Sequence, residues 1–188
     1  KQAADLFTSS SLSGKKVLIT LGGTIEAIDP VRYITNHSSG KMGMALAHEC
    51  IQAGAKTTLI IGSISIDIEK RAEVIRIVSA EDMYKAVMQR IESQDLFISC
   101  AAVADFRPKN ISNNKIKKNN NSVTIELIKN KDILASVCQL NKKPICIGFA
   151  AETENFIDNA RAKLASKLCE AIILNDVTQS EIGLNSDE

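Results

Sequence analysis

The sequence lacks the features of a membrane or secreted protein. None of its apolar runs approaches the roughly 20 residues that a membrane-spanning helix needs. No secretory signal is recognisable near the start of the chain. These two absences predict a cytoplasmic protein with no membrane partner.

An excess of charge of either sign is also missing. Lys and Arg together number 23, Asp and Glu number 22, and the net charge is +1. A protein with so little net charge has no general attraction for nucleic acid or for a lipid surface. We therefore expect no nucleic-acid partner, and any anion binding must be local.

The cysteines form no recognisable framework. They are Cys50, Cys100, Cys138, Cys146 and Cys169. No two of them have C-x-x-C spacing, and most lie within apolar runs. Their odd number and scattered positions disfavour a disulfide network or a cysteine metal site. We expect buried free thiols in a reducing compartment.

Three motifs of common enzyme classes are absent. The turn after the first predicted strand reads Gly22-Gly23-Thr24, which is not the dinucleotide pattern G-x-G-x-x-G. Gly40-Lys41 is followed by Met42, so the Walker pattern is not met either. No serine lies in a G-x-S-x-G elbow, and His37 and His48 suggest no catalytic triad. An NAD enzyme, an ordinary P-loop NTPase and a serine hydrolase are therefore disfavoured.

The sequence has the composition and patterning of one globular domain. Its 188 residues are 45% hydrophobic and 24% charged. The predicted strands are residues 16–21, 57–61, 74–78, 96–101, 145–149 and 171–174, and the predicted helices are residues 40–53, 80–93, 131–140 and 155–168. Apolar strands that alternate with helices predict an α/β fold, specifically a Rossmann-like three-layer sandwich around a mainly parallel sheet.

Two polar segments stand apart from this alternation. Residues 1–14 end in a run of small polar residues, which predicts a linker or the tail of a preceding domain ahead of a main domain at 15–188. Residues 109–122 are rich in Asn and Lys, and residues 123–128 alternate like an exposed strand. We expect a lysine-rich flap or hairpin there.

The most informative stretch is residues 28–43, which read I-D-P-V-R-Y-I-T-N-H-S-S-G-K-M-G. Connections in α/β units usually have two to six residues, so one this long normally carries function. Its four successive hydrogen-bonding side chains, Asn36–Ser39, precede Gly40 and Gly43, which permit close backbone approach at a helix start. Helix amides there predict an anion site. The alternative, a helix cap by one serine, explains only part of the run.

Ligand sites in parallel sheets lie beyond the carboxyl ends of the strands. Four polar or small-residue segments follow predicted strands, at residues 22–43, 102–108, 150–153 and 175–176. We therefore expect one edge of the sheet to hold the chemistry.

The charged residues near this edge allow two interpretations each. Lys115–Lys118 is either solvated surface or a flexible cationic arm over a phosphate or carboxylate. Lys163 and Lys167 are four residues apart on a predicted helix, which is compatible with a clamp for a polyanion and also commonplace. Asp105 either accepts a hydrogen bond from a ligand or caps a turn, and Thr153 caps the next helix or borders the site.

Taken together, the motifs resemble those of bacterial phosphopantothenate–cysteine ligase. They are residues 28–43, A-A-V-A-D-F at 101–106, K-I-K-K at 115–118, N-K-D-I at 130–133, G-F-A-A-E-T at 148–153, the lysine pair at 163 and 167, N-D-V at 175–177 and G-L-N-S-D at 183–187. The resemblance covers the chain from about residue 15 to its end.

This resemblance implies a reaction, its partners and an assembly. Phosphopantothenate, CTP and cysteine would give phosphopantothenoylcysteine, CMP and pyrophosphate through an acyl-cytidylate, with Mg²⁺ offsetting charge. Many members are the C-terminal half of a bifunctional coenzyme A biosynthesis protein whose other half is an FMN-dependent decarboxylase. Members are homodimers, so the resemblance implies a homodimer here.

The resemblance also implies roles for individual residues. Asn36 would handle the acyl-cytidylate and amide formation, and Lys115 would be the mobile cation over the nucleotide phosphates. The other residues implied for the nucleotide are Ala101, Asp105, Asn130, Lys131, Asp132, Ile133, Phe149, Lys163 and Lys167. Those implied for phosphopantothenate are Arg32, Ser38, Ser39 and Gly40, together with Asn36. Metal ligands are not implied by any of these motifs.

Two departures from the family pattern bear on this expectation. Lys131 stands where the family often has proline. The chain ends at Glu188, where the family continues with a further strand and helix, so we expect a truncated C-terminal end. The alternatives from other classes are a nucleotide-binding or assembly module without turnover and an NAD(P) reductase on the same fold.

Overall fold

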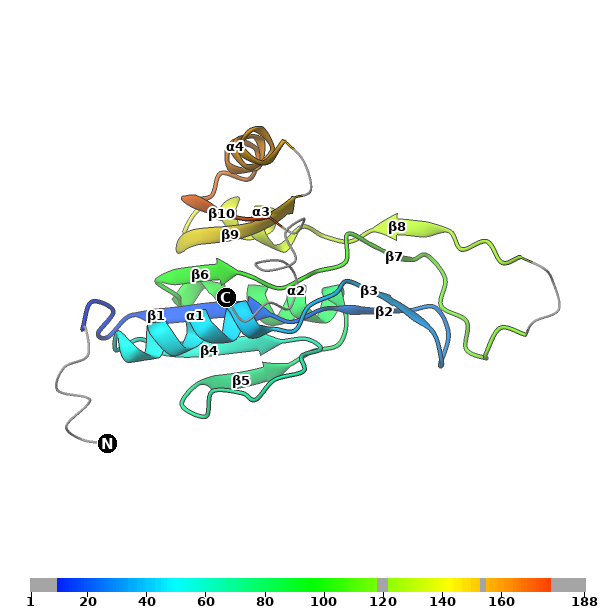
Figure 1. Ribbon diagram of the computed structural model, residues 1–188, viewed down its shortest axis with the longest axis horizontal. Helices are drawn as coiled ribbons and strands as arrows, with labels where there is room; N and C mark the ends of the chain where they lie inside the picture. Colours follow the sequence, from blue (N-terminus) through cyan, green and yellow to red (C-terminus); the bar gives the residue numbers. More distant parts are fainter. Residues whose placement is uncertain (1–9, 118–121, 153–154, 177–188) are drawn as a thin grey trace.

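The computed structural model describes residues 10–117, 122–152 and 155–176, and a parallel six-stranded sheet forms its centre (Figure 1). The strands are β1 (Lys16–Leu21), β4 (Lys56–Ile61), β5 (Glu73–Arg76), β6 (Leu96–Ser99), β9 (Ile145–Glu152) and β10 (Ala171–Asp176). Their spatial order is β10-β9-β6-β1-β4-β5. Because the chain proceeds outward from β1 in one direction and then from β6 in the other, this is the doubly wound order of a Rossmann-like fold, as predicted.

The central strands are apolar along their length because both of their faces are covered. In β1, the five residues from Val17 to Leu21 are all buried, and β4 buries the five from Thr57 to Ile61. The edge strand β5 buries none of its four residues. A continuous apolar run therefore marks a central parallel strand, and this explains why the sequence located β1 and β4 so well.

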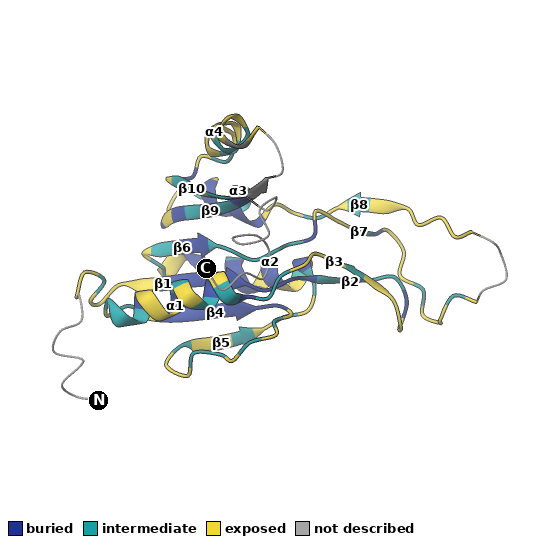
Figure 2. Ribbon diagram, in the orientation of Figure 1, coloured by how far each residue is buried: buried dark blue, intermediate teal, exposed yellow. Residues whose placement is uncertain are grey.

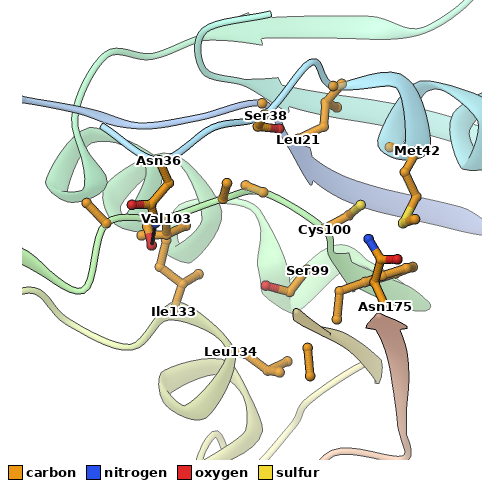
Figure 3. A pocket seen from close by; sticks show the side chains of 18 of the residues that line it. Leu21, Asn36, Ser38, Met42, Ser99, Cys100, Val103, Ile133, Leu134 and Asn175 are labelled. Atoms are coloured by element: carbon orange, nitrogen blue, oxygen red, sulfur yellow. Dashed lines mark hydrogen bonds between the residues drawn. The ribbon is translucent and has the colours of Figure 1, made fainter. Parts of the chain in front are cut away.

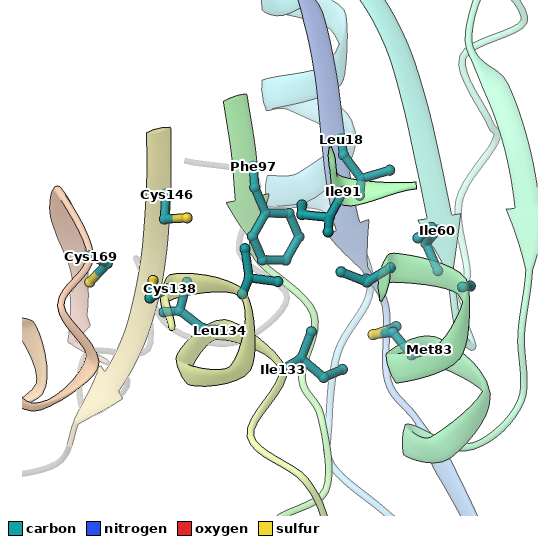
Figure 4. Close-up of a cluster of buried hydrophobic side chains, with 13 residues drawn as sticks. Leu18, Ile60, Met83, Ile91, Phe97, Ile133, Leu134, Cys138, Cys146 and Cys169 are labelled. Atoms are coloured by element: carbon teal, nitrogen blue, oxygen red, sulfur yellow. The ribbon is translucent and has the colours of Figure 1, made fainter. Parts of the chain in front are cut away.

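Helices lie on both sides of the sheet. Helix α1 (Lys41–Gln52) packs on one face over β1 and β4. On the other face, α2 (Ala80–Met88) and α3 (Ile133–Cys138) enclose a core built around Phe97, Leu18 and Met83 (Figure 4). Helix α4 (Phe156–Lys167) packs against β10 and α3. The three-layer prediction is confirmed.

Two short hairpins form an arm that projects beyond the carboxyl ends of the strands (Figure 1). One pairs β2 (Ile25–Ala27) with β3 (Tyr33–Thr35), and the other pairs β7 (Phe106–Pro108) with β8 (Leu127–Lys129). We call residues 25–35 and the described part of 106–129 the arm. A hairpin is present in the lysine-rich region, as predicted. The strand predicted at 123–128 is wrong for most of its length, because β8 begins only at Leu127.

The structure differs from the sequence prediction in several element bounds. Strands β9 and β10 extend to Glu152 and Asp176, so residues 150–152 and 175–176, which were predicted to follow strands, lie within them. Residues 28–43 are not one loop, because their first part holds the end of the β2–β3 hairpin. The predicted helix at 80–93 ends at Met88, and a separate 3₁₀ turn, Ile91–Ser93, follows. The predicted helix at 131–140 is only the six-residue α3. Helix α2 begins with a capping box, in which the Ser79 hydroxyl accepts from the amide of Asp82 at 3.2 Å.

The glycines at the start of α1 serve the packing of the protein itself. Gly40 has φ of 82°, in the left-handed region that side chains disfavour. A Cβ on Gly43 would lie 2.4 Å from the Cβ of Leu21 in β1. These two glycines therefore let α1 approach the sheet closely, and the close approach predicted for them is to β1 and its neighbours.

We expect Gly43→Ala to destabilise the protein by about 2 kcal/mol, because the added methyl overpacks the contact with β1. The intrinsic helix preference for Ala over Gly, about 1 kcal/mol, acts in the opposite direction. Urea unfolding followed by circular dichroism measures the difference. Ala45→Gly, at an exposed position of the same helix, calibrates the helix preference alone. A stabilised Gly43→Ala variant would show that α1 can move away from β1.

The described residues bear on three features that the sequence was expected to lack, namely disulfides, a metal site and a membrane-spanning helix. All five cysteines are free. No group of three or more His, Cys, Asp or Glu side chains within residues 10–117, 122–152 and 155–176 could hold a metal ion. In the same ranges no helix is long and apolar enough to cross a membrane. Lys118, Thr153 and the motif at 183–187 lie outside the described residues, as do most of the predicted linker and the chain end.

Candidate active site

An open cleft of about 1510 Å³ lies at the carboxyl ends of β1 and β6, where the strand order reverses (Figure 3). The predicted site residues that line it are Asn36, Ser38, Ser39, Gly40, Ala101, Asp105, Asn130, Lys131, Asp132, Ile133, Phe149, Lys163 and Lys167. They come from five segments that are far apart in the sequence. The switch point of a doubly wound sheet is where such folds bind ligands, so the cleft is the candidate site.

The segment after β1 is hydrogen-bonded to the segment after β6. The amide of Thr24 donates to the carbonyl of Ala102 at 3.2 Å, and the Thr24 hydroxyl accepts from the amide of Ala104 at 3.0 Å. Thr24 is fully buried. Because these bonds tie the two loops together, the floor of the cleft is fixed before any ligand arrives.

Asn36 is held at the cleft from both of these loops. Its side-chain amide nitrogen donates to the carbonyl of Val103 at 3.2 Å. The preceding hydroxyl, of Thr35, donates to the carbonyl of Thr24 at 2.7 Å. The two bonds orient the carboxamide at the mouth of the cleft, where Figure 3 shows Asn36 beside Val103.

The amino end of α1 supplies backbone donors to the same cleft. Gly40 occupies the N-cap position and has no side chain with which to cap the first turn. The Ser39 hydroxyl accepts from the amide of Lys41 at 3.3 Å, so the capping interpretation holds in part. Ser38 and Ser39 are half-buried and line the cleft. Unsatisfied helix amides favour an anion in this position.

The opposite wall carries positive charge from α4. Lys163 and Lys167 both line the cleft. The ammonium of Lys167 lies 3.3 Å from a carboxylate oxygen of Asp132. Asp132 also caps α3 by accepting from the amide of Ala135 at 2.9 Å. The ion pair therefore fixes the end of α4 relative to the start of α3.

The predicted nucleotide loop at 130–133 has structural roles as well. The side chain of Asn130 donates to the carbonyl of Ala104 at 2.8 Å and accepts from Arg107 at 2.7 Å. Lys131 lies 3.4 Å from the carboxylate of Glu81 and 4.3 Å from the centre of the Tyr84 ring. These contacts hold the loop in place at the position where the family often has proline.

Two of the predicted site residues, Arg32 and Lys115, are not among those that line the cleft. Arg32 lies at the β2–β3 turn, where its guanidinium pairs with the carboxylate of Asp29. Lys115 is exposed on the arm. The Arg32 guanidinium donates to the carbonyl of Ile116 at 2.8 Å, and Ile116 directly follows Lys115 in the chain.

The cleft also contains residues that sequence reasoning did not select. Ser99, Cys100, Leu134 and Asn175 line it (Figure 3). Burial raises the pKa of the Cys100 thiol to about 12, so this cysteine is not a thiolate nucleophile at neutral pH. The segment of Asn175 was predicted to follow a strand, whereas the structure places it within β10, near the carboxyl end of that strand. Apolar residues such as Leu134 carried no comparable signal.

A sequence model of the DNA/pantothenate metabolism flavoprotein C-terminal domain matches residues 12–188. That match covers almost the whole chain. The chain belongs to this family. The expectation from the motifs is thereby confirmed at the level of the family.

Relatives in this family have similar sequences and a similar fold. The coenzyme A biosynthesis bifunctional protein CoaBC of Vibrio parahaemolyticus is 51% identical over 185 residues, which cover 97% of this chain and 46% of that protein. The CoaBC of Bacillus subtilis is 46% identical over 181 residues, 96% of this chain and 45% of that protein. A crystal structure of the C-terminal domain of CoaBC superimposes with a TM-score of 0.80 at 40% identity, over 89% of this chain and 80% of that one. The chain thus spans about half the length of the curated relatives it matches.

Proposed function

We propose that this chain catalyses the CTP-dependent ligation of cysteine to 4′-phosphopantothenate in the cytoplasm, as a step of coenzyme A biosynthesis. The observation that supports it most directly is that a single cleft combines an anion-receptive helix start beside Asn36 with the two lysines of α4. A phosphorylated acid and a nucleoside triphosphate are both anions, and the cleft offers each a separate set of donors. The family relatives are named for coenzyme A biosynthesis.

In the proposed first step, the carboxylate of phosphopantothenate attacks the α-phosphorus of CTP and pyrophosphate leaves. The product is an acyl-cytidylate, in which the acid is activated. In the second step, the amine of cysteine attacks the acyl carbon, the amide forms, and CMP leaves with the electron pair of the broken C–O bond. Bringing two anions together requires fixed cations and fixed geometry, which the hydrogen-bonded floor of the cleft and Lys163 and Lys167 supply.

We assign Asn36 to the acyl group and its transfer, and Ser38, Ser39 and Gly40 to the phosphopantothenate side. Ala101, Asp105, Phe149 and the loop at 130–133 are assigned to the nucleotide, because all of them line the cleft on the side of β6 and β9. Lys115 is assigned to the nucleotide phosphates from the arm.

Magnesium enters this proposal as the complex of CTP. The described residues offer no group of three metal-ligating side chains. Of the two carboxylates among the assigned cleft residues, Asp132 is paired with Lys167, and we assign Asp105 to the metal. Mg²⁺ is commonly bound by one or two carboxylates together with substrate phosphates. The donor set therefore fits a metal that arrives with the nucleotide.

FMN would belong to a decarboxylase domain joined through residues 1–14, with residues 15–188 as the ligase domain.

We also propose that the chain forms a homodimer through the arm. Figure 2 shows that much of the arm is exposed. Its exposed large hydrophobic side chains are Val31, Tyr33, Phe106, Ile111, Val123, Ile125 and Leu127. A concentration of apolar surface on one projection is typical of an interaction surface, and a second copy of the chain presents a matching one.

Pyrophosphate release tests the proposed function. We expect release only when CTP, cysteine and phosphopantothenate are all present with Mg²⁺, and the appearance of phosphopantothenoylcysteine by mass spectrometry in equal amount. Each substrate is omitted in turn as a control. Calorimetric binding of CTP without any product would instead favour a nucleotide-binding module. Saturable binding of NADPH in the same calorimeter would favour a reductase.

A further inference from the structure

The β2–β3 turn holds a buried carboxylate that has no place in the reaction proposed above. The side chain of Asp29 is fully buried, although it lies at the tip of a projecting hairpin. One of its oxygens accepts from the amides of Val31 and Arg32, both at 2.8 Å. The other accepts from the guanidinium of Arg32 and, at 3.1 Å, from the amide of Ile116. These donors offset the free-energy cost of burying a charged carboxylate, which would be large without them.

The contact joins two segments that are more than 80 residues apart in the sequence. Arg32 bridges them, since its guanidinium binds Asp29 and also donates to the carbonyl of Ile116 at 2.8 Å. Both backbone groups of Ile116 are therefore bound, one by Asp29 and one by Arg32. Nearby, the amide of Ser112 donates to the carbonyl of Ile28 at 3.0 Å. The segment 112–116 is thus fastened along the turn of the other hairpin.

Charge keeps this contact in place. The Arg32 guanidinium holds the pKa of the Asp29 carboxyl well below its usual range, so Asp29 stays ionised at neutral pH. Hydrogen bonds to an ionised acceptor are about twice as strong as neutral ones. By contrast, the lysines on either side of Ile116, Lys115 and Lys117, are exposed.

We propose that Asp29 and Arg32 are positioning residues, which fix the backbone at Ile116 and thereby place Lys115 and Lys117. This gives Arg32 a role in the arm in place of direct contact with phosphopantothenate. The same turn leads into the three-residue strand β3 and from it to Asn36. One short strand therefore connects the fastened lysine segment to the cleft. The catalytic part of this inference rests on the proposed function, whereas the fastening itself does not.

The test uses Asp29→Asn. The substituted side chain keeps one acceptor oxygen for the turn amides but presents an NH₂ group to Arg32 and to the Ile116 amide. We expect hydrogen exchange at the Ile116 amide, measured by NMR, to become about tenfold faster because a charge-assisted bond is lost. Arg32→Lys should act in the same direction, because an ammonium cannot bridge both groups as a guanidinium does. Glu126→Gln, which removes an exposed ion pair with Lys109 on the same arm, should leave the exchange rate unchanged. Equal exchange in the wild type and Asp29→Asn would overturn the proposal.

A double-variant cycle distinguishes positioning from a general structural role. Asp29→Asn should raise the KM for CTP about tenfold, and combining it with Lys115→Gln should add little to the effect of Lys115→Gln alone. Additive effects would show that Asp29 does not act through Lys115. If the wild-type chain releases no pyrophosphate, the proposed function fails, while the exchange rates still decide whether Asp29 and Arg32 hold Ile116.

Discussion

Asn36→Asp is expected to lower the rate of pyrophosphate release by about 100- to 1,000-fold, which is the usual effect of removing one preorganised donor from an active site. The two side chains have nearly the same shape. Asp, however, cannot donate to the carbonyl of Val103, which lies 3.2 Å from the nitrogen of Asn36. A carboxylate there would be repelled by that carbonyl and would add a negative charge where two anionic substrates meet. Steady-state kinetics with saturating substrates measures the loss.

The change should act on catalysis and leave the fold intact. Asn36 is exposed at the cleft mouth, so its replacement disturbs no packing, and the urea midpoint of the variant should match that of the wild type. Asn141→Asp makes the same chemical change at an exposed position outside both the cleft and the arm and should keep full activity. Unchanged turnover in Asn36→Asp would remove Asn36 from the reaction.

The sequence predicted the layers of this fold because their signals are local. A parallel strand that is covered on both faces must be apolar along its length, and β1 and β4 read that way. Helix ends carried signals of the same kind, such as the capping box at Ser79 and the left-handed Gly54 after α1, with φ of 90°. The rule that ligand sites follow strand ends then located the cleft, with no knowledge of which residues touch.

The arm was harder to predict because its strands are too short for a period to show. Strands β2 and β3 have three residues each, so an alternating pattern has hardly begun before each one ends. The turn that joins them contains the buried Asp29, and the sequence gives no indication that an Asp-Pro turn would contact a segment more than 80 residues away. For this reason residues 28–43 looked like one long loop.

The prediction of residue roles within the cleft from the sequence was limited in the same way. Sequence spacing placed Lys163 and Lys167 on one face of a helix, but it could not show that Lys167 pairs with Asp132. Gly40 and Gly43 were correctly identified as sites of close approach, yet only the structure shows that Gly40 approaches Ile64 and Gly43 approaches Leu21. Residue types therefore indicated where contacts occur, and the fold decided their partners.

Replacing both lysines of α4, with Lys163→Gln and Lys167→Gln together, is expected to weaken the binding of magnesium CTP about 100-fold. Each ammonium that contacts a phosphate contributes a charge-assisted hydrogen bond, so each single variant should lose about tenfold. Both side chains line the cleft, and the double variant lacks both of the α4 ammonium groups that we propose bind the triphosphate. Isothermal titration calorimetry of the protein with magnesium CTP measures the loss directly.

Arg161→Gln on the same helix is the matched control. It removes one positive charge from α4, but residue 161 lies about 200° around the helix from Lys163 and does not line the cleft. Its affinity for CTP should stay within about twofold of the wild type at 0.15 M salt, where screening limits the effect of distant charges. A loss equal to that of Lys163→Gln would show that the general charge of α4, and not contact with the phosphates, governs binding.

The ion pair at the end of α4 predicts a partial rescue. In Lys167→Gln the carboxylate of Asp132, normally 3.3 Å from the lysine, loses its partner and faces the phosphates. Adding Asp132→Asn removes this repulsion and keeps the cap of α3, because Asn and Asp cap helices about equally well. The double variant should therefore bind CTP more tightly than Lys167→Gln alone, although less tightly than the wild type. If Asp132→Asn instead weakens binding further, the carboxylate itself contributes to holding magnesium CTP.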